Sequence, residues 1–206
     1  MPRTADHDLR RAQMAAAVHR LIAHDGLDAA TMSAVAREAG FSVGLVQHYF
    51  ASKDDLLLFA YERLTADLLT RVAARTADGE AAGHSIRAIM LDCLAELLPL
   101  DPARRGEHRV SRAFQARAMD NPTAAEVAAA TAAVLRTRVA QGIANGKECG
   151  ETDPTTDPDL AATELTALVD GLADLVYRDP TRATTAGAIL ATRLAELLPG
   201  RCRHYD

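Results

Sequence analysis

The chain of 206 residues carries a net charge of −5, is 49% hydrophobic, and contains only 4% aromatic residues with no Trp. Its length suits a small domain followed by a larger one. No stretch approaches the ~18 uncharged apolar residues of a membrane span, and the first residues have no apolar signal-peptide core. Alanine-rich segments with few glycines favour helix over strand, so we expect an all-α, cytoplasmic protein.

The first predicted helix covers Asp8 to His24 and ends at Gly26. Its apolar residues recur at helical spacing and form one face; they are Met14, Val18, Leu21 and Ile22. Arg10 and Arg11 lie near the start of this helix. They either touch the backbone of a bound DNA or are solvated charges, and the sequence leaves both interpretations open.

Residues 31–53 form the pattern of two short helices joined by a tight turn. Thr31 is a typical N-cap, since its hydroxyl accepts a bond from a backbone N–H that has no partner inside the helix. Gly40 suits the left-handed conformation that ends a helix, and Ser42 caps the second helix. The apolar positions facing the core are Met32, Val35, Ala36, Ala39, Val46 and Phe50. This pattern predicts a helix-turn-helix, whose second helix enters the major groove.

The outward positions of the second helix are small or polar. Gln47 offers the paired donor and acceptor with which glutamine reads adenine. Tyr49 and Lys53 suit phosphate contacts, helix starts bind anions through free N–H groups, and Gly44 permits close approach to a partner. The predicted DNA-binding residues are Arg10, Arg11, Thr31, Ser42, Val43, Gly44, Leu45, Gln47, His48, Tyr49 and Lys53.

Six further helices are predicted. One runs from Ser52 to Ala77 and would carry a signal between the two domains, and another covers His84 to Leu98. Four later starts share an Asp or Asn followed by Pro, which begins a helix well because that Pro lacks only an N–H that would go unused. These four helices are placed at about 102–119, 122–145, 158–178 and 180–198. Residues 145–157 are polar and rich in Gly, Pro and Thr, which predicts a loop.

The last two predicted helices are apolar over more than one face, so each must be buried on more than one side. We expect them to meet their symmetry mates in a four-helix homodimer interface. The residues assigned to it are Leu165, Leu168, Val169, Leu172, Leu175, Val176, Ile189, Leu190, Leu194 and Leu197. A two-fold dimer suits a palindromic operator, because two reading helices about 34 Å apart meet successive major grooves.

The run AREAGFSVGLVQHYFASKDDLL resembles the DNA-binding signature of TetR-family regulators, with its Ala-Gly-x-Ser turn, the pair Tyr49-Phe50 and a Ser-Lys-Asp helix start. This resemblance covers residues 9–58, and LLPLDPARR and ALVDGL further on resemble the BetI-like branch. It implies a helix-turn-helix domain at 1–52 and a helical effector-binding and dimerisation domain at 53–206. It also implies double-stranded DNA, a second copy of the chain and a small-molecule effector as partners.

The resemblance places an effector among the middle helices. The candidate effector-binding residues are Met90, Cys93, Phe114, Met119, Asp170 and Asp174. The first four either line a pocket or belong to ordinary core packing. The two aspartates either meet a cationic effector or pair with Arg178 or Arg193 at an interface. A quaternary ammonium is usually caged by aromatic rings, which are scarce here, so choline is not carried over from the BetI-like branch.

The sequence contains no Gly-x-Ser-x-Gly elbow, phosphate-binding glycine loop or His-Glu-x-x-His motif. Cys93, Cys149 and Cys202 show neither metal spacing nor a disulfide framework, so no enzymatic activity, metal or cofactor is predicted. The prediction is a sequence-specific transcriptional regulator, a repressor released by its effector. The alternative is a helical dimer that binds a small molecule or protein and no longer binds DNA. The charge of the N-terminal region supports this alternative. Residues 1–53 hold six basic and five acidic side chains, a net charge of +1, whereas nucleic-acid-binding domains are usually strongly basic.

Overall fold

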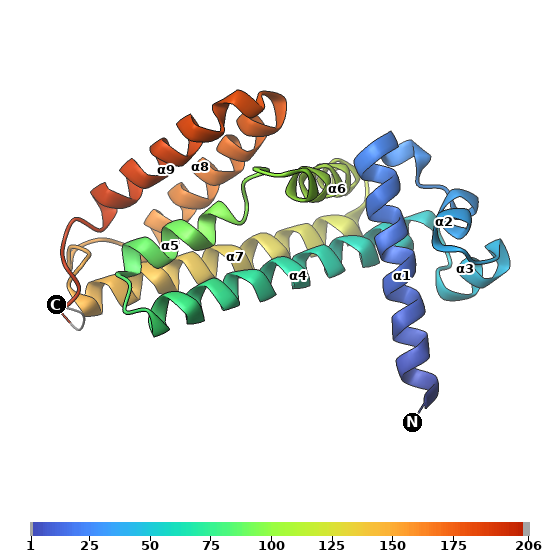
Figure 1. Cartoon of the computed structure of the whole chain (residues 1–206), viewed down its shortest axis with the longest axis horizontal. Coiled ribbons are helices and arrows are strands. Elements are labelled where there is room, and N and C mark those ends of the chain that lie inside the picture. Colours follow the sequence, from blue (N-terminus) through green and yellow to red (C-terminus); the bar gives the residue numbers. More distant parts are fainter. Residues whose placement is uncertain (1, 204–206) are drawn as a thin grey trace. The chain divides into compact units, whose positions relative to one another are not determined.

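The computed structural model describes residues 2–203, with side chains from His7 onward. Within this part of the chain it contains nine α-helices, two short 3-10 helices and no strand, which confirms the all-α prediction (Figure 1). Packing divides the chain into two compact units. The first unit comprises the residues up to Asp67 together with Arg105–Ala128, and the second comprises Leu68–Arg104 and the residues from Ala129 onward.

The first unit contains the predicted helix-turn-helix. Its elements are α1 (Pro2–Asp25), a 3-10 turn (Leu27–Ala29), α2 (Met32–Ala39), α3 (Val43–Tyr49), the start of α4 (Lys53–Ala81), most of α6 (Pro102–Ala118) and the start of α7 (Pro122–Cys149). Their apolar faces converge on one core, whose buried members include Met14, Val18, Ile22, Val35, Val46, Phe50, Leu56 and Phe114. The predicted inward faces of the first three helices are therefore confirmed.

The second unit is a bundle of aliphatic helices. Its elements are α5 (Ile86–Ala95), α8 (Pro158–Arg178), a 3-10 turn (Pro180–Arg182), α9 (Ala183–Leu197) and the remaining parts of α4 and α7. Helices α8 and α9 lie side by side, and α5 packs on α9 (Figure 1). The core consists largely of Leu, Ile, Val and Ala, including Leu94, Ile143, Leu165, Leu172, Leu190, Leu194 and Leu198.

Two helices extend beyond their predicted ends. α4 continues to Ala81 rather than ending near residue 77, and α7 continues to Cys149, so the prediction of a loop from residue 145 is wrong for its first part. The glycines that suggested breaks are packing positions. A Cβ on Gly79 would lie 2.5 Å from the Ile89 side chain, and one on Gly146 would lie 2.7 Å from Thr152 Oγ1. Gly therefore stays inside each helix because a neighbouring segment occupies the space of its side chain.

The other predicted helices are present with shifted ends. α1 begins at Pro2. α5 begins at Ile86 rather than His84 because Ser85 caps it, accepting a bond from the Ala88 N–H at 3.2 Å, and it ends at Ala95 rather than Leu98. The predicted helix at 180–198 starts as a 3-10 turn before α9 begins at Ala183. Among the described residues no helix is both long and apolar enough to cross a membrane.

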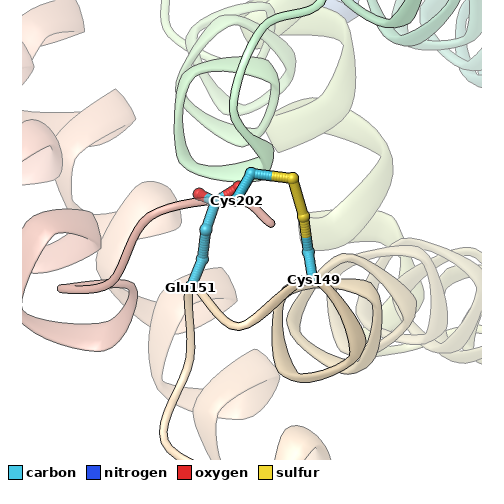
Figure 2. Close-up of side chains that lie close together, drawn as sticks. All are labelled: Cys149, Glu151 and Cys202. Atoms are coloured by element: carbon cyan, nitrogen blue, oxygen red, sulfur yellow. A yellow bond between two sulfur atoms is a disulfide. The ribbon is translucent and has the colours of Figure 1, made fainter. Parts of the chain in front are cut away.

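Cys149 and Cys202 form a disulfide, so the expectation that the cysteines would stay unpaired is wrong (Figure 2). They lie 53 residues apart in the sequence, and no local spacing signals such a pairing. Packing also groups α6 and the start of α7 with the N-terminal helices, so the compact units are discontinuous in sequence. The proposed functional boundary near residue 52 remains a prediction.

Candidate nucleic-acid interface and effector region

The turn between α2 and α3 has the geometry that its sequence predicts. The Thr31 hydroxyl accepts a bond from the Ala34 N–H, and the Ser42 hydroxyl accepts one from the Leu45 N–H, both at 3.2 Å. Gly40 ends α2 in the left-handed conformation, with φ 73° and ψ 28°. That conformation is costly for other residues, so Gly40 fixes the sharp change of direction that presents α3.

One face of α3 is open. Val43, Gly44, Gln47 and His48 are exposed, while Val46 on the opposite face is fully buried. No described atom outside its own helix backbone and immediate neighbours lies within 4 Å of the place that a Cβ on Gly44 would take. Packing within the chain therefore does not explain the glycine. A bare helix surface beside Gln47 is what close approach to a base edge requires.

Four other predicted DNA-binding residues also have partners inside the chain. Leu45 and Tyr49 are half-buried against the first core, and the Tyr49 ring lies 4.6 Å from that of His7. The Arg11 guanidinium lies 4.2 Å from the centre of the Phe59 ring. Lys53 Nζ donates to the Leu27 carbonyl at 3.0 Å. Arg10 is half-buried, and the two cap residues Thr31 and Ser42 are exposed.

Two arginines of α6 with no predicted role donate to α1 and to the start of α4, the helices on either side of the helix-turn-helix. Arg109 donates to the carbonyl of Ala23 near the end of α1, where backbone acceptors lack helical partners. Arg117 donates twice to the Asp54 carboxylate at the start of α4, at 2.9 and 2.7 Å. These bonds from Arg117 lower the pKa of Asp54, with burial opposing them.

The candidate effector residues belong to different compact units. Met90 and Cys93 belong to the second unit, whereas Phe114 and Met119 belong to the first. Met119 is 87% exposed, and its role toward an effector stays a prediction. Phe114 is buried and stacks on Tyr61 with ring centres 4.0 Å apart. A cleft beside this stack is lined in part by Asp54, Leu57, Phe114, Arg117 and Asn121.

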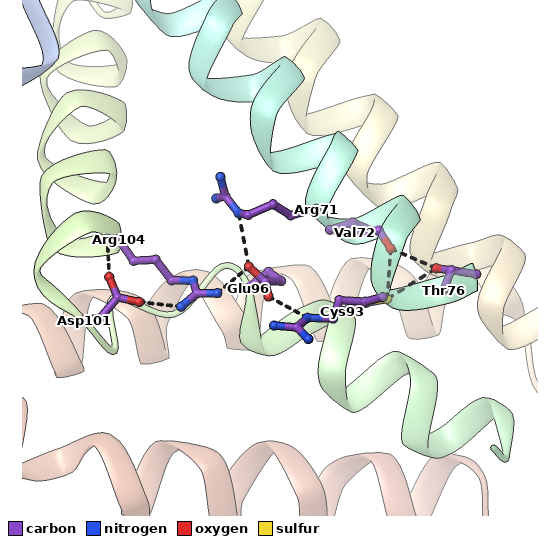
Figure 3. Close-up of polar contacts among 8 residues, drawn as sticks. Arg71, Val72, Thr76, Cys93, Glu96, Asp101 and Arg104 are labelled. Atoms are coloured by element: carbon purple, nitrogen blue, oxygen red, sulfur yellow. Dashed lines mark hydrogen bonds and ion pairs between the residues drawn. The ribbon is translucent and has the colours of Figure 1, made fainter. Parts of the chain in front are cut away.

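The second unit contains a buried carboxylate with three arginine partners (Figure 3). Glu96 Oε1 accepts from Arg75 at 2.9 Å, and Oε2 accepts from Arg71 at 3.1 Å and Arg104 at 2.5 Å. Burial alone would raise the pKa of Glu96, but these three bonds outweigh it and lower the pKa. The Cys93 thiol lies next to this cluster, 3.4 Å from Thr76 Oγ1, and burial raises its pKa.

The residues assigned to the dimer interface fall into two groups. Leu165, Val169, Leu172, Val176, Leu190 and Leu194 are buried in the core of the second unit. These six side chains pack against the core of their own chain. The other four members are half-buried or, for Ile189, 40% exposed; they are Leu168, Leu175, Ile189 and Leu197.

The two aspartates of α8 are an exposed Asp170 and a half-buried Asp174. Arg193, one of their two expected partners, instead holds Glu164 at 2.7 Å and Glu196 at 2.9 Å. These bonds account for the position of Arg193 without an aspartate from α8. The assignment of Asp170 and Asp174 to an effector stays a prediction.

An exposed reading helix on a helix-turn-helix, joined to a helical bundle, defines a class of proteins, the DNA-binding regulators of transcription. Residues 14–59 match the model of bacterial regulatory proteins of the tetR family, and residues 86–199 match that of the C-terminal part of BetI-type transcriptional repressors. The chain therefore belongs to the TetR family of bacterial transcriptional regulators.

Individual relatives agree with this assignment. The HTH-type transcriptional regulator PksA of Bacillus subtilis is 32% identical over 88% of this chain and 85% of its own. A BetI regulator of Burkholderia mallei is 30% identical over 84% of each protein. A transcriptional regulator from Rhodococcus sp. Rha1 superposes with a TM-score of 0.79 at 31% identity, covering 93% of this chain and 97% of its own. A regulator from Saccharomonospora viridis, solved in complex with choline, has a TM-score of 0.76 at 24% identity, covering 90% and 93%.

Proposed function

We propose that the protein is a homodimeric repressor that binds a palindromic operator and is released by a small-molecule effector. The observation that carries the proposal is the open face of α3, where Gln47 and His48 lie exposed beside a glycine that no described residue covers. A helix with this surface fits the major groove. The proposed readers are Val43, Gly44, Gln47 and His48, with Thr31, Ser42 and Tyr49 beside them on phosphates.

The near-neutral charge of the N-terminal residues limits the ion pairs that they can form with DNA phosphates. Arg20 is paired with Glu38 at 2.6 Å, and Arg11 and Lys53 have partners inside the chain. These contacts engage three of the basic side chains of this region, so we infer that hydroxyls and backbone N–H groups at the starts of α2 and α3 supply much of the backbone contact. Fewer ion pairs give a shallower dependence of affinity on salt.

The proposed dimer interface uses the outer faces of α8 and α9. Leu160 is 70% exposed and Ile189 is 40% exposed, while Leu168, Leu175 and Leu197 are half-buried. Apolar side chains on neighbouring helices offer a surface that a second copy can cover. A two-fold partner would then place two α3 helices on one face of DNA.

The effector is proposed to differ in chemistry from the choline bound by the Saccharomonospora viridis regulator. The chain has four Tyr, four Phe and no Trp. Tyr61 and Phe114 stack on each other, and the Phe50 and Phe59 rings lie 5.6 Å apart beside Arg11. Among the described residues of the second unit, Tyr177 is the one aromatic residue. This composition does not supply the aromatic cage that a quaternary ammonium favours.

Selection of bound duplexes from a random DNA pool by the purified protein tests this function. We expect an enriched palindrome, which then allows compounds to be screened for release of the DNA. The competing function is a helical module that binds a small molecule or protein and has lost DNA binding, and near-neutral charge favours it. A folded dimer that enriches no sequence at moderate salt would establish that second function and overturn the first.

A further inference from the structure

The disulfide between Cys149 and Cys202 joins two segments that have no part in the proposed DNA contacts. Cys149 is the last residue of α7, and Cys202 follows α9 (Figure 2). Their Cα atoms lie 4.9 Å apart, and each side chain is only 6% exposed. The bond therefore holds the C-terminal segment, residues 198–203, against the turn at residues 149–152.

Backbone contacts fit the C-terminal segment closely to that turn. The Gly200 N–H donates to the Glu151 carbonyl and the Arg203 N–H to the Cys149 carbonyl, each at 2.9 Å. A Cβ on Gly200 would lie 2.3 Å from the Gly150 carbonyl oxygen, so only glycine allows this approach. The disulfide and these bonds act on the same few residues.

The turn also supports the start of α5. The Glu151 side chain is 1% exposed, and its carboxylate accepts the N–H groups of Ile86 at 2.7 Å and Arg87 at 3.0 Å. These are N–H groups of the first helical turn, which have no partner inside the helix and attract negative charge. The position of Glu151 thus links the disulfide-bonded turn to α5.

We propose that Cys149 and Cys202 are a reversible redox pair, a latch that sets how firmly the C-terminal segment and the start of α5 are held. A regulator that meets DNA works where thiols are kept reduced, and disulfides formed there are usually transient or redox-sensing. Reduction by a dithiol transfers two electrons and two protons, giving two Cys thiols and one oxidised dithiol. In the reverse direction a hydroperoxide oxidises one thiol to a sulfenic acid with loss of water or alcohol. The second thiol then displaces water to form the disulfide.

Counting of free thiols in the full-length protein tests whether the pair is reversible. Protein treated with hydrogen peroxide and then unfolded in the presence of an alkylating reagent should take up one alkyl group, on Cys93. Protein treated with dithiothreitol should take up three, and renewed oxidation should restore one. A count that stays at one or at three under both treatments would overturn the latch.

Hydrogen exchange tests whether the bond holds the segments. On reduction, amide exchange of residues 85–88, 149–152 and 198–203 should accelerate at least about tenfold. The thermal midpoint should fall by roughly 5–15 °C, because a long loop is no longer closed in the unfolded chain. Cys93→Ser is the matched control and should retain both responses. Unchanged exchange would overturn the proposal. The variants Cys149→Ser and Cys202→Ser remove the disulfide permanently. If they do not fold, reduction and reoxidation of the native chain give the same comparison.

A metal site is the other outcome that the geometry permits. The two sulfurs and the Glu151 carboxylate have ligand atoms within 4.8 Å of one another, and thiolates and carboxylates bind zinc. A reduced protein that retains one zinc ion per chain after gel filtration, and then resists peroxide, would replace the latch with a zinc site. Reduced protein that holds no zinc and reoxidises supports the latch.

Discussion

Gln47 is the residue on which direct reading of DNA is proposed to depend. Its side chain is exposed on α3 beside Gly44, so a base edge can reach both its donor and its acceptor. Gln47→Ala should weaken binding by roughly 1–3 kcal/mol and remove discrimination at one base position only. Titration of the selected operator and its single-base variants measures this. Gln141→Ala, which removes an exposed glutamine from α7, is the control. Equal weakening on every sequence would contradict a base-reading role.

Lys53 has two predicted roles that one variant separates. Its ammonium donates to the Leu27 carbonyl at 3.0 Å, which ties the start of α4 to the turn before α2. Lys53→Ala should therefore lower the free energy of unfolding by about 1–2 kcal/mol. If the same ammonium also contacts a phosphate, the slope of log affinity against log salt should fall by about one. Lost stability with an unchanged slope would leave Lys53 a structural role alone.

At the scale of elements, Arg109 connects α6 to the end of α1. It donates to the carbonyls of Ala23 and His24, which lie 86 and 85 residues away in sequence. Arg109→Ala should cost roughly 1–2 kcal/mol of unfolding free energy, because the half-buried Ala23 carbonyl loses a charged donor. Urea unfolding measures the loss, with exposed Arg136→Ala as the control. An equal, small effect of both variants would show that Arg109 is not a tie between these helices.

Glu96 gives the second unit a pH dependence at low pH. Because its folded pKa is lowered, its contribution to stability is fully present above about 4.5, the usual glutamate value, and is lost as pH falls through the folded pKa. Glu96→Gln should cost about 2–3 kcal/mol at pH 7, since three arginines lose a buried partner. Below about pH 4.5, the unfolding free energy of Glu96→Gln should also depend less on pH than that of Glu80→Gln, a control at an exposed glutamate. If the unfolding free energy of Glu96→Gln falls with decreasing pH as steeply as that of the native protein, a group other than Glu96 causes the dependence.

What the sequence reveals depends on the range of the interaction. The caps at Thr31 and Ser42 and the left-handed Gly40 are local, and each was predicted and confirmed. The Cys149–Cys202 bond, the Glu151 cap on α5 and the Arg109 tie join distant segments, and no spacing encodes them. Periodicity likewise shows that α8 is apolar on two sides. It does not show whether the chain or a partner covers each side, and Leu165 and Leu172 are covered by the chain itself.

At the scale of the whole molecule, two copies of α3 are proposed to read one face of an operator. The direct measurement is an equilibrium titration of the selected operator against the same DNA with roughly 5 base pairs, half a turn, inserted between the half-sites. We expect two chains per operator and at least tenfold weaker binding to the lengthened DNA, since the second α3 helix would then face away from its half-site. Equal affinity for both duplexes, or one chain per site, would contradict it.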